Sequence, residues 1–470
     1  MRANHRVVVV GAGISGLAAA AGILRRAKGA PLDLRVLEAA ERPGGKIWTL
    51  RDEGVLHETG PNGWLDSAPS TGALVRHLGL DSKIVRADAA AERRFVLKHG
   101  DLTLLPANPA AFLRSPILSG RAKLRVAAEL IVPRRDPAAG DESLADFGRR
   151  RLGAEALTWL LDPFVTGIHA GDPERISVTA AFPKIAALES KHGGLFRGMI
   201  AGGRARRRAR AAGGRRGGGA AGPGGTLTSL EGGLRTLVEA IAELLGDRLL
   251  LGQPVEAVEP GGDDGSFIVR SADRCIEADQ VVLAVPAPAT AKLLQPFAQA
   301  AARACLAIPH APVSVVETLF DRADVGADLT GFGFLCPGAE GRRILGSLWT
   351  SSIFPGARAP SGKVLLRTLV GGRRQSELAL GSESDLLSLV LDELRVILAI
   401  EGSPERSFIT RWQEAIPQYE LGHCERVATI DRDLPARLHL VGNAFRGIGI
   451  NDCTAAAEGV AERVVSGRGA

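Results

Sequence analysis

The sequence predicts an α/β fold with α+β insertions. The first 45 residues alternate strand, helix and strand patterns, as a parallel βαβ unit does. Strand and helix patterns return after residue 226 and near the C-terminus, with a helical stretch before them. At 470 residues, the chain has room for about three domains of roughly 150 residues. Its 45% hydrophobic and 23% charged residues are close to globular averages, which excludes wholesale disorder.

The N-terminal elements follow from residue type. Arg6–Val10 contains four consecutive valines, as a strand buried on both faces of a parallel sheet requires. Gly11–Gly16 is a glycine-rich turn, and Leu17–Ala27 is rich in helix-forming residues. Leu34–Leu37 is a second apolar strand, which ends at Glu38.

Helical patterns and a low-complexity tract occupy the middle of the chain. Leucines and arginines recur at roughly helical spacing in Ala110–Ile131, and Glu142–Leu161 also has a helical pattern. Gly198–Gly225 is dominated by Gly, Ala and Arg, without the interleaved aromatic residues that stack on nucleic-acid bases. We therefore expect a solvated, flexible loop over 201–225 and no nucleic-acid partner, with contact to anionic lipid as a second option.

The C-terminal half predicts a second sheet and a return to the first. Apolar periodicity predicts helices over Leu234–Leu245 and Leu386–Ala399. Apolar and β-branched runs predict strands near Val255 and at Gln280–Val285, Ser314–Phe320, Arg343–Trp349 and Lys363–Val370. The chain ends with a strand at Leu438–Val441, then a glycine-rich turn and a helix.

The charge and cysteine content limit the kinds of ligand and metal site that the protein can have. Lys and Arg total 58, Asp and Glu total 52, and the net charge of +6 permits acidic ligands or an anionic membrane surface. The five cysteines are widely spaced and form no Cys-x-x-Cys pair, so we expect no metal site and no disulfide framework, as fits a reducing cytoplasm. The N-terminal apolar run lacks a cleavage site typical of a signal peptide, and no other uncharged run reaches the roughly 18 residues of a spanning helix.

The motif Gly11-Ala12-Gly13-Ile14-Ser15-Gly16 lies between the first strand and the first helix. In a Rossmann-like unit, Gly11 permits the tight turn, Gly13 lets a pyrophosphate approach the backbone, and Gly16 lets the helix pack on the strand. Free N–H groups and the positive helix end then hold the phosphates. Glu38, roughly 20 residues further on, can accept a hydrogen bond from a ribose 2′-hydroxyl, and its carboxylate would repel the 2′-phosphate of NADP.

The segment that follows distinguishes a flavin dinucleotide from NAD. It reads Glu38-Ala39-Ala40-Glu41-Arg42-Pro43-Gly44-Gly45-Lys46. The glycine pair lets a second loop approach the dinucleotide, and Arg42 adds positive charge. This arrangement resembles the extended flavin fingerprint of the amine oxidase-like FAD superfamily, which implies non-covalent FAD as the cofactor.

Four further segments resemble one family of that superfamily, the oxygen-dependent protoporphyrinogen oxidases of bacterial type. They read Gly60-Pro61-Asn62-Gly63-Trp64, Leu230-Glu231-Gly232-Gly233-Leu234, Ile416-Pro417-Gln418-Tyr419-Glu420-Leu421-Gly422-His423, and Gly442-Asn443-Ala444-Phe445-Arg446-Gly447-Ile448-Gly449-Ile450-Asn451-Asp452-Cys453. The last two are the specific matches, because the family typically reads IPQY followed by GH, and a GN segment ending in G-NDC. The family often has Ser-Phe where Gly63-Trp64 stands here, and the arginine tract is not a family signature.

The resemblance implies cofactor contacts at matching positions. Besides the two glycine segments, with Gly45 and Lys46, these positions are Gly60, Pro61, Asn62, Gly63, Val255, Gly442, Asn443, Ile448, Gly449 and Ile450. Gly442 and Gly449 would leave room for the flavin, while Ile448 and Ile450 would supply apolar contact. The alternative is a strand-to-helix turn with core isoleucines. Asn62 is expected to orient the substrate rather than to act as an acid or base.

The same resemblance implies a substrate site. Arg94 matches an arginine that faces a substrate propionate, and its guanidinium suits a carboxylate, although Arg93 could take that role through a one-residue slip. Gly167 matches a backbone position near the substrate, and nearby His169 is either a general base or a core residue. The positions that match residues sandwiching the macrocycle, each of which could instead be sheet core, are Leu335, Leu348 and Leu369.

The resemblance implies FAD-dependent oxidation of protoporphyrinogen IX to protoporphyrin IX in haem biosynthesis, with O2 as acceptor and H2O2 as the second product. Coproporphyrinogen III is the nearest alternative substrate, since it differs only in two propionates that replace vinyl groups. A polyamine or phytoene-type flavin oxidase is a further alternative, and a non-catalytic FAD-binding protein is the alternative from another class.

A membrane surface is expected at 107–133, where apolar residues lie among basic ones, as in an interfacial helix on anionic lipid. The apolar residues are Phe112, Leu113, Ile117, Leu118, Leu124 and Val126, and the basic ones are Arg114, Arg121, Lys123 and Arg125. An ordinary amphipathic helix packed on the core is the alternative. The family resemblance favours a cytoplasmic protein associated peripherally with the inner membrane, and ferrochelatase and a second copy of the chain are further candidate partners.

These expectations give a discontinuous domain plan. The FAD-binding domain comprises 1–70, 226–290 and 418–470, and the substrate domain comprises 71–88 and 291–417. A helical, membrane-associated domain takes 89–200, and the Gly/Arg-rich loop takes 201–225.

Overall fold

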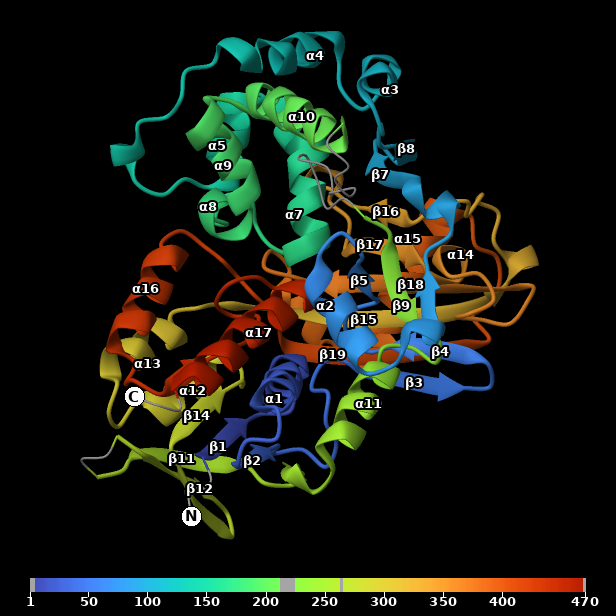
Figure 1. Cartoon of the computed structure of the whole chain (residues 1–470). Coiled ribbons are helices and arrows are strands. Elements are labelled where there is room, and N and C mark those ends of the chain that lie inside the picture. Colours follow the sequence, from blue (N-terminus) through green and yellow to red (C-terminus); the bar gives the residue numbers. More distant parts are fainter. Residues whose placement is uncertain (1–4, 212–224, 263–264, 468–470) are drawn as a thin grey trace.

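The computed structural model describes residues 5–211, 225–262 and 265–467. Both ends of the described chain lie in one α/β layer, at the lower left of Figure 1. The helices between residues 109 and 211 form a separate group at the top, and a second sheet lies to the right.

Five parallel strands form the first sheet. Their order is β10 (Leu249–Leu250), β2 (Leu32–Leu37), β1 (His5–Val10), β14 (Gln280–Leu283) and β20 (Leu438–Leu440). Strands from the beginning, middle and end of the chain are therefore neighbours, and the predicted parallel sheet is confirmed.

The four valines of β1 divide between the two faces of this sheet. Val7 and Val9 pack in one core cluster, and Val8 and Val10 pack in another. The first cluster includes α1 (Ile14–Ala27), α11 (Arg235–Leu245) and α17 (Ile450–Ser466), and the second includes α12 (Ala287–Leu294) and α13 (Gln299–Leu306). Because successive side chains of a strand point to opposite faces, burial on both faces explains the unbroken valine run.

Smaller elements complete this layer. They are the hairpin β3 (Thr49–Asp52) and β4 (Val55–Glu58), the sheet β5 (Trp64–Leu65), β9 (Leu227–Leu230) and β6 (Ile84–Arg86), the sheet β11 (Val255–Pro260), β12 (Phe267–Ser271) and β13 (Arg274–Ala278), and the helices α2 (Pro69–His77) and α16 (His423–Asp433). The strand predicted near Val255 is thus β11, which pairs with β12 rather than with the parallel sheet.

Seven strands form the second sheet. Their order is β19 (Arg406–Pro417), β15 (His310–Asp321), β18 (Lys363–Gly371), β17 (Ile344–Trp349), β16 (Gly333–Leu335), β7 (Arg94–Lys98) and β8 (Asp101–Leu104). The three strands predicted for this sheet are confirmed. However, β7 and β8 also belong to it, so the expected start of the helical domain at residue 89 is wrong. The helical group begins only at α3 (Pro109–Arg114).

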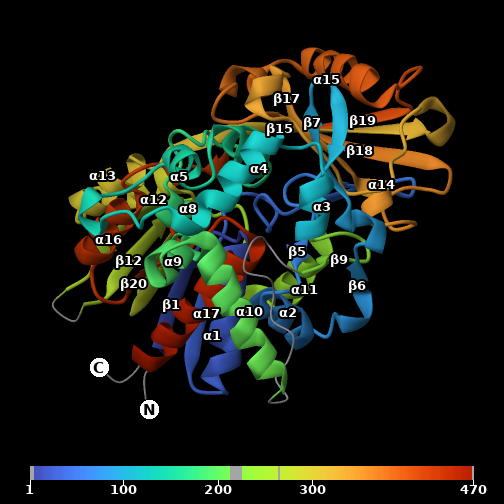
Figure 2. The same ribbon diagram turned by 90° about the horizontal axis from the view of Figure 1, so that it is seen from above.

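One face of the second sheet packs on α15 (Glu383–Leu398), whose leucines share a core cluster with Val364, Leu366 and Val370 of β18. Figure 2 shows α15 along the outer edge of this layer, away from α1 and α17. Odd-numbered side chains of β18, such as Leu365, therefore point to the opposite face, toward the rest of the molecule.

The helical group differs from its prediction in two places. Its remaining helices are α4 (Gly120–Ala127), α5 (Leu144–Arg151), α6 (Ala154–Ala156), α7 (Asp162–His169), α8 (Val178–Ala181), α9 (Pro183–His192) and α10 (Leu195–Ala211). The single helix expected over Ala110–Ile131 is broken after α3, because Pro116 disfavours a helical conformation at Ser115, which is extended. Residues 201–211 of the expected loop are helical, since Ala and Arg are strong helix formers, and 212–224 lie outside the described residues.

No helix in the described ranges is both long and apolar enough to cross a bilayer.

Packing on α15 gives a prediction for stability. Leu394 is fully buried and Val396, two residues on, is 67% exposed. We expect Leu394→Ala to lower the free energy of unfolding by about 2–5 kcal/mol, because it removes buried methyl groups and leaves a cavity. Val396→Ala, the matched control, should change it by less than about 0.5 kcal/mol. Urea unfolding followed by tryptophan fluorescence measures both, and equal effects would contradict the assignment of this face.

Candidate functional site

The Gly11–Gly16 turn joins β1 to α1, as predicted. A Cβ on Gly16 would lie 1.9 Å from the carbonyl oxygen of Gly11, and Gly11 itself has φ +98° and would place a Cβ 2.9 Å from Ala284 O. By contrast, a Cβ on Gly13 would meet nothing within 4 Å. Two glycines are thus required by packing, and the third leaves an open side where a phosphate can approach the backbone. Of the residues between them, Ile14 is half-buried and Ser15 is buried.

Glu38 lies beside this turn, at the carboxyl end of β2. Its carboxylate accepts hydrogen bonds from the backbone N–H groups of Ala12, at 2.6 Å, and Ala40, at 3.0 Å. Its carbonyl oxygen accepts from Gln253 N at 2.7 Å, and Val255, half-buried, begins β11 two residues later. Glu38, the residue predicted to contact the ribose, therefore lies at the turn, with Val255, a predicted FAD contact, near it.

The second glycine segment lies against the first. Gly44 forms a parallel bridge with Gly13 and donates from its N–H to Ala12 O at 2.7 Å. Gly45 has φ +57°, and a Cβ there would lie 3.4 Å from the Cα of Gly13. Arg42 stacks over the Trp48 ring at 4.7 Å, and burial lowers the pKa of its guanidinium. Ala39 is exposed.

The Gly60–Gly63 loop packs against the end of the second glycine segment and against β9. A Cβ on Gly60 would lie 1.9 Å from Lys46 O, and one on Gly63 would lie 2.4 Å from Thr228 O. Pro61 between them is half-buried. Both polar atoms of the Asn62 amide are buried without a hydrogen-bond partner among the described residues. A buried amide costs free energy unless a ligand satisfies it, so Asn62 fits a position beside a polar cofactor.

The two specific C-terminal motifs contact each other through Tyr419, the only tyrosine of the chain. Its hydroxyl donates to Asn443 O and accepts from Gly447 N, both at 2.7 Å. The ring stacks on His423 at 3.9 Å, and His423 Nε2 donates to Phe445 O at 3.1 Å. Side chains of one motif therefore fix the backbone of the other.

The two isoleucines of the turn before α17 differ in burial. Gly442 has φ +152°, and Gly449 N donates to the Asp452 carboxylate at 3.1 Å. Ile448 is half-buried, whereas the Ile450 side chain is 6% exposed and packs in the core cluster of α1. The core alternative thus holds for the Ile450 side chain, and only Ile448 has an open side.

Strand alternation gathers the predicted substrate residues. Phe95, Phe334, Trp349 and Val370 face α15, so their neighbours Arg94, Leu335, Leu348 and Leu369 share the opposite face of the second sheet. All four of the latter are only half-buried. Gly167 on α7 meets this face, because a Cβ on it would lie 2.9 Å from Leu335 Cδ1. Sheet and helix therefore come together at the residues that the sequence predicts.

Arg94 differs from its neighbour Arg93. Arg93 lies 3.9 Å from the Asp328 carboxylate and over the Phe95 ring at 5.6 Å. The Arg94 guanidinium lies over Phe332 at 5.1 Å and has no carboxylate partner within 4 Å among the described residues. Burial lowers the pKa of Arg94, with Glu92 opposing. The half-buried Arg94 guanidinium, which lacks an ion-pair partner in the described part of the chain, suits an anionic group of a ligand.

His169 is a core residue. It is 2% exposed, and its ring contacts those of Phe182, at 5.2 Å, and Tyr419, at 6.0 Å. Burial lowers the pKa of His169 to about 4, with a further contribution from His423. The ring is enclosed by aromatic neighbours, and the low pKa makes the imidazole a weak base, which together argue against the general-base alternative.

The structure also contains a buried ionic cluster that the sequence did not predict. Arg367 on β18 pairs with Glu317 on β15 at 2.8 Å, and His57 Nδ1 lies 2.9 Å from the same carboxylate. Arg358 lies 3.4 Å from the carboxylate of Glu58, and all five side chains are at most 4% exposed. The sequence did contain a signal for this cluster, because Glu317 and Arg367 are single charged residues within otherwise apolar runs of β15 and β18.

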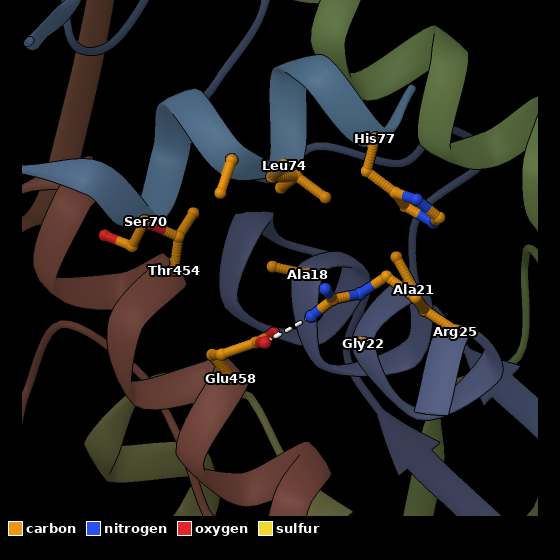
Figure 3. Close-up of a pocket in the computed structure, with 10 residues that line it drawn as sticks. Ala18, Ala21, Gly22, Arg25, Ser70, Leu74, His77, Thr454 and Glu458 are labelled. Carbon is orange, nitrogen blue, oxygen red and sulfur yellow. Dashed lines mark hydrogen bonds and ion pairs between the residues drawn. The ribbon is translucent and has the colours of Figure 1, made fainter. Parts of the chain in front are cut away.

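A separate small pocket lies between α1, α2 and α17 (Figure 3). Its volume of about 90 Å³ is well below the roughly 300–1,000 Å³ of ligand pockets. Arg25, its cation, is paired with Glu458. It is too small for a dinucleotide or a tetrapyrrole.

Comparisons with known proteins agree with this geometry. The coproporphyrinogen III oxidase of Bacillus subtilis (strain 168) is 32% identical over 465 residues, covering 96% of this chain and 96% of that protein. Protoporphyrinogen oxidase 1 of Arabidopsis thaliana chloroplasts is 32% identical over 461 residues, covering 95% and 85%. The crystal structure of an Exiguobacterium sp. 255-15 protein, provisionally assigned as a protoporphyrinogen oxidase, matches with TM-score 0.82 and 28% identity, covering 99% and 100%.

The model of the family described as flavin-containing amine oxidoreductases matches residues 14–465. This match and the whole-chain relatives confirm the predicted flavin cofactor and the predicted oxidoreductase class. The chain belongs to the flavin-containing amine oxidoreductase family, with protoporphyrinogen and coproporphyrinogen III oxidases among its relatives.

Proposed function

We propose that this protein uses FAD, bound non-covalently, to oxidise a porphyrinogen in tetrapyrrole biosynthesis. The observation that carries the proposal is the part of the second sheet opposite α15 that presents half-buried leucines and the Arg94 guanidinium, which has no carboxylate within 4 Å in the described part of the chain. Whole-chain relatives named for protoporphyrinogen and coproporphyrinogen III oxidation support it.

This face lies next to the flavin loops. Arg367 and Leu369 are two residues apart on β18 and share a face, and Arg367 donates to Gly60 O. Leu369 is therefore near the Gly60–Gly63 loop, while Leu335 contacts α7 at Gly167. An apolar macrocycle between Leu335 and Leu369 would lie beside the cofactor, with an acid arm toward Arg94.

A porphyrinogen matches this surface chemically. Its ring system is apolar, and its propionate arms are carboxylates, which an arginine fork binds well. A bound FAD supplies the two-electron acceptor for the ring oxidation. The protein's own part is to bind the ring against leucines, to exclude water there, and to orient the reacting carbon through the Asn62 amide.

We also propose O2 as the final acceptor and a peripheral position at the cytoplasmic face of the inner membrane. The helical group offers the contact surface, since α3 and α4 lie at its outer end (Figure 1). Within residues 107–133, the large apolar residues that are exposed by 42% or more are Leu113, Leu124, Leu130 and Ile131. Exposed basic residues among them are Arg114, Arg121 and Arg134.

This surface differs from the expected one. Ile117, Leu118 and Val126 are buried in the helical group and Arg125 donates to carbonyls of α5, so these residues are unavailable for lipid contact. Leu130 and Ile131 take their place. An exposed apolar patch bordered by arginines suits the interface of an anionic bilayer.

The first test of the proposal is an oxygen-electrode assay of the FAD-loaded protein with protoporphyrinogen IX and coproporphyrinogen III in parallel. We expect porphyrin fluorescence to rise with about three O2 consumed per porphyrin, one for each two-electron round. Putrescine serves as the amine control and should give no oxygen uptake. A yellow protein that oxidises neither porphyrinogen would instead be a non-catalytic flavin-binding protein.

Arg94→Ala should raise KM for the porphyrinogen about 10- to 100-fold while flavin content stays unchanged, because a charge-assisted hydrogen bond to a carboxylate is lost. Arg93→Ala is the matched control and should change KM by less than about two-fold, since Arg93 is exposed and contacts Asp328. Steady-state kinetics would contradict the assignment if Arg93→Ala gave the larger effect.

The double variant Leu124→Glu/Ile131→Glu should lose most binding to phosphatidylglycerol-containing vesicles, because it places charge on the apolar patch. Leu306→Glu, on α13 and 60% exposed in the α/β layer, is the control and should sediment like the parent protein. Equal sedimentation of all three proteins would refute the membrane surface.

A further inference from the structure

Side chains of the second sheet hold the backbone of residues 58–60, just before Asn62. Arg367 on β18 donates to the first and third carbonyl oxygens of this segment. Trp412 on β19 donates through Nε1 to the second, at 2.7 Å. Three consecutive carbonyls of the flavin domain therefore accept from two side chains of the substrate sheet.

The same segment is confined from its other side. A Cβ on Gly60 would lie 1.9 Å from Lys46 O, so the second glycine segment packs directly against it. Lys46 itself donates from Nζ to the carbonyl oxygen of Glu414 on β19. The loop is thus enclosed between the flavin fingerprint and the sheet, and its position depends on both.

Arg367 is itself held in one orientation. It is 3% exposed, and Glu317, fully buried, lies 2.8 Å from its Nη1. Glu317 also lies 2.9 Å from His57 Nδ1, and His57 Nε2 is 3.2 Å from Thr410 Oγ1. Buried charges with several partners are geometrically specific, because any movement would leave one of them unpaired.

The connection from residue 60 to residue 62 is short and stiff. Pro61 has its φ fixed by its ring, so few free dihedrals separate the held carbonyl of Gly60 from the Asn62 amide. Both polar atoms of the Asn62 amide are buried and have no hydrogen-bond partner among the described residues. Its direction must therefore be set by the backbone that carries it.

We propose that Arg367 and Trp412 are positioning residues of the flavin site. By holding the carbonyl oxygens of residues 58–60, they fix the Gly60–Gly63 loop against the second glycine segment and aim the Asn62 amide. The substrate sheet thereby sets the geometry of the cofactor loop.

Trp412→Phe tests this with the smallest change, since it removes one hydrogen-bond donor and keeps an aromatic ring. We expect the dissociation constant of FAD for the deflavinated protein to rise about five-fold, measured by quenching of flavin fluorescence. Trp349→Phe is the matched control, because Trp349 Nε1 is buried and has no partner among the described residues. Its FAD affinity should stay within about two-fold of the parent protein.

Variants of Arg367 distinguish the effect of its positive charge from the effect of its hydrogen bonds to two carbonyl oxygens. Arg367→Lys keeps the charge for Glu317 but cannot bind two carbonyls as a fork, so FAD affinity should fall about ten-fold with a small loss of thermal stability. Arg151→Met is the control for Arg367→Met. Arg151 is equally buried in the helical group, pairs with Glu129 and donates to backbone carbonyls there. Both methionine variants should melt earlier, but only Arg367→Met should weaken FAD binding.

A kinetic measurement follows at saturating FAD, and it rests on the proposed function. Trp412→Phe should lower kcat for the porphyrinogen with KM unchanged, because Asn62 is misaimed while the substrate surface is intact. Unchanged FAD affinity in both Trp412→Phe and Arg367→Lys would overturn the inference, as would equal weakening in Arg151→Met. If the affinities change as expected but the parent protein oxidises no porphyrinogen, the inference stands and the proposed function fails.

Discussion

Direct contact between backbone segments at glycine residues is the constraint on which the site depends. The Gly44–Gly45 pair lies on the Gly11–Gly16 turn, and Gly60 lies on Lys46 at the end of the second glycine segment. There is no space for a Cβ at Gly60 or, within the first turn, at Gly16. Each contact brings a strand-to-helix or strand-to-loop turn close enough for its N–H groups to face a common ligand. The rest of the molecule serves to keep these turns at that distance.

The two sheets contribute differently to the site. The parallel sheet is buried on both faces by helices, so its strands are apolar throughout, and the ends of β1 and β2 carry the dinucleotide residues. The second sheet packs on α15 with one face, and its other face meets the flavin loops at Arg367 and α7 at Leu335. This second face also carries the half-buried Arg94 and the three half-buried leucines. Period-two alternation explains how strands that are distant in sequence contribute to one surface.

Charge burial marks where the two sheets meet. Arg367, Glu317, His57, Arg358 and Glu58 are almost fully buried, although burial of charge is costly unless partners compensate. Burial raises the pKa of Glu317, but the interactions with His57 and Arg367 lower it by more. The pKa of Glu317 is therefore below its ordinary value. For Glu58, burial dominates over Arg358 and the pKa is raised. Such a cluster tolerates little relative movement, which fits a junction between cofactor loop and substrate surface.

The sequence alone determined the βαβ unit, the flavin fingerprint and the family. These depend on local patterns, namely four valines, glycines at set spacing and short contiguous motifs, each of which is legible without knowing what packs on it. Tertiary structure alone decided that β7 and β8 join the second sheet, that Ile450 is core, and that Arg367 and Trp412 hold the Gly60 loop. Arg367 shows the physical reason. The sequence identifies an arginine in a strand, but it does not show whether the side chain contacts water or the carbonyl oxygen of Gly60, 307 positions away; only the folded chain fixes that partner.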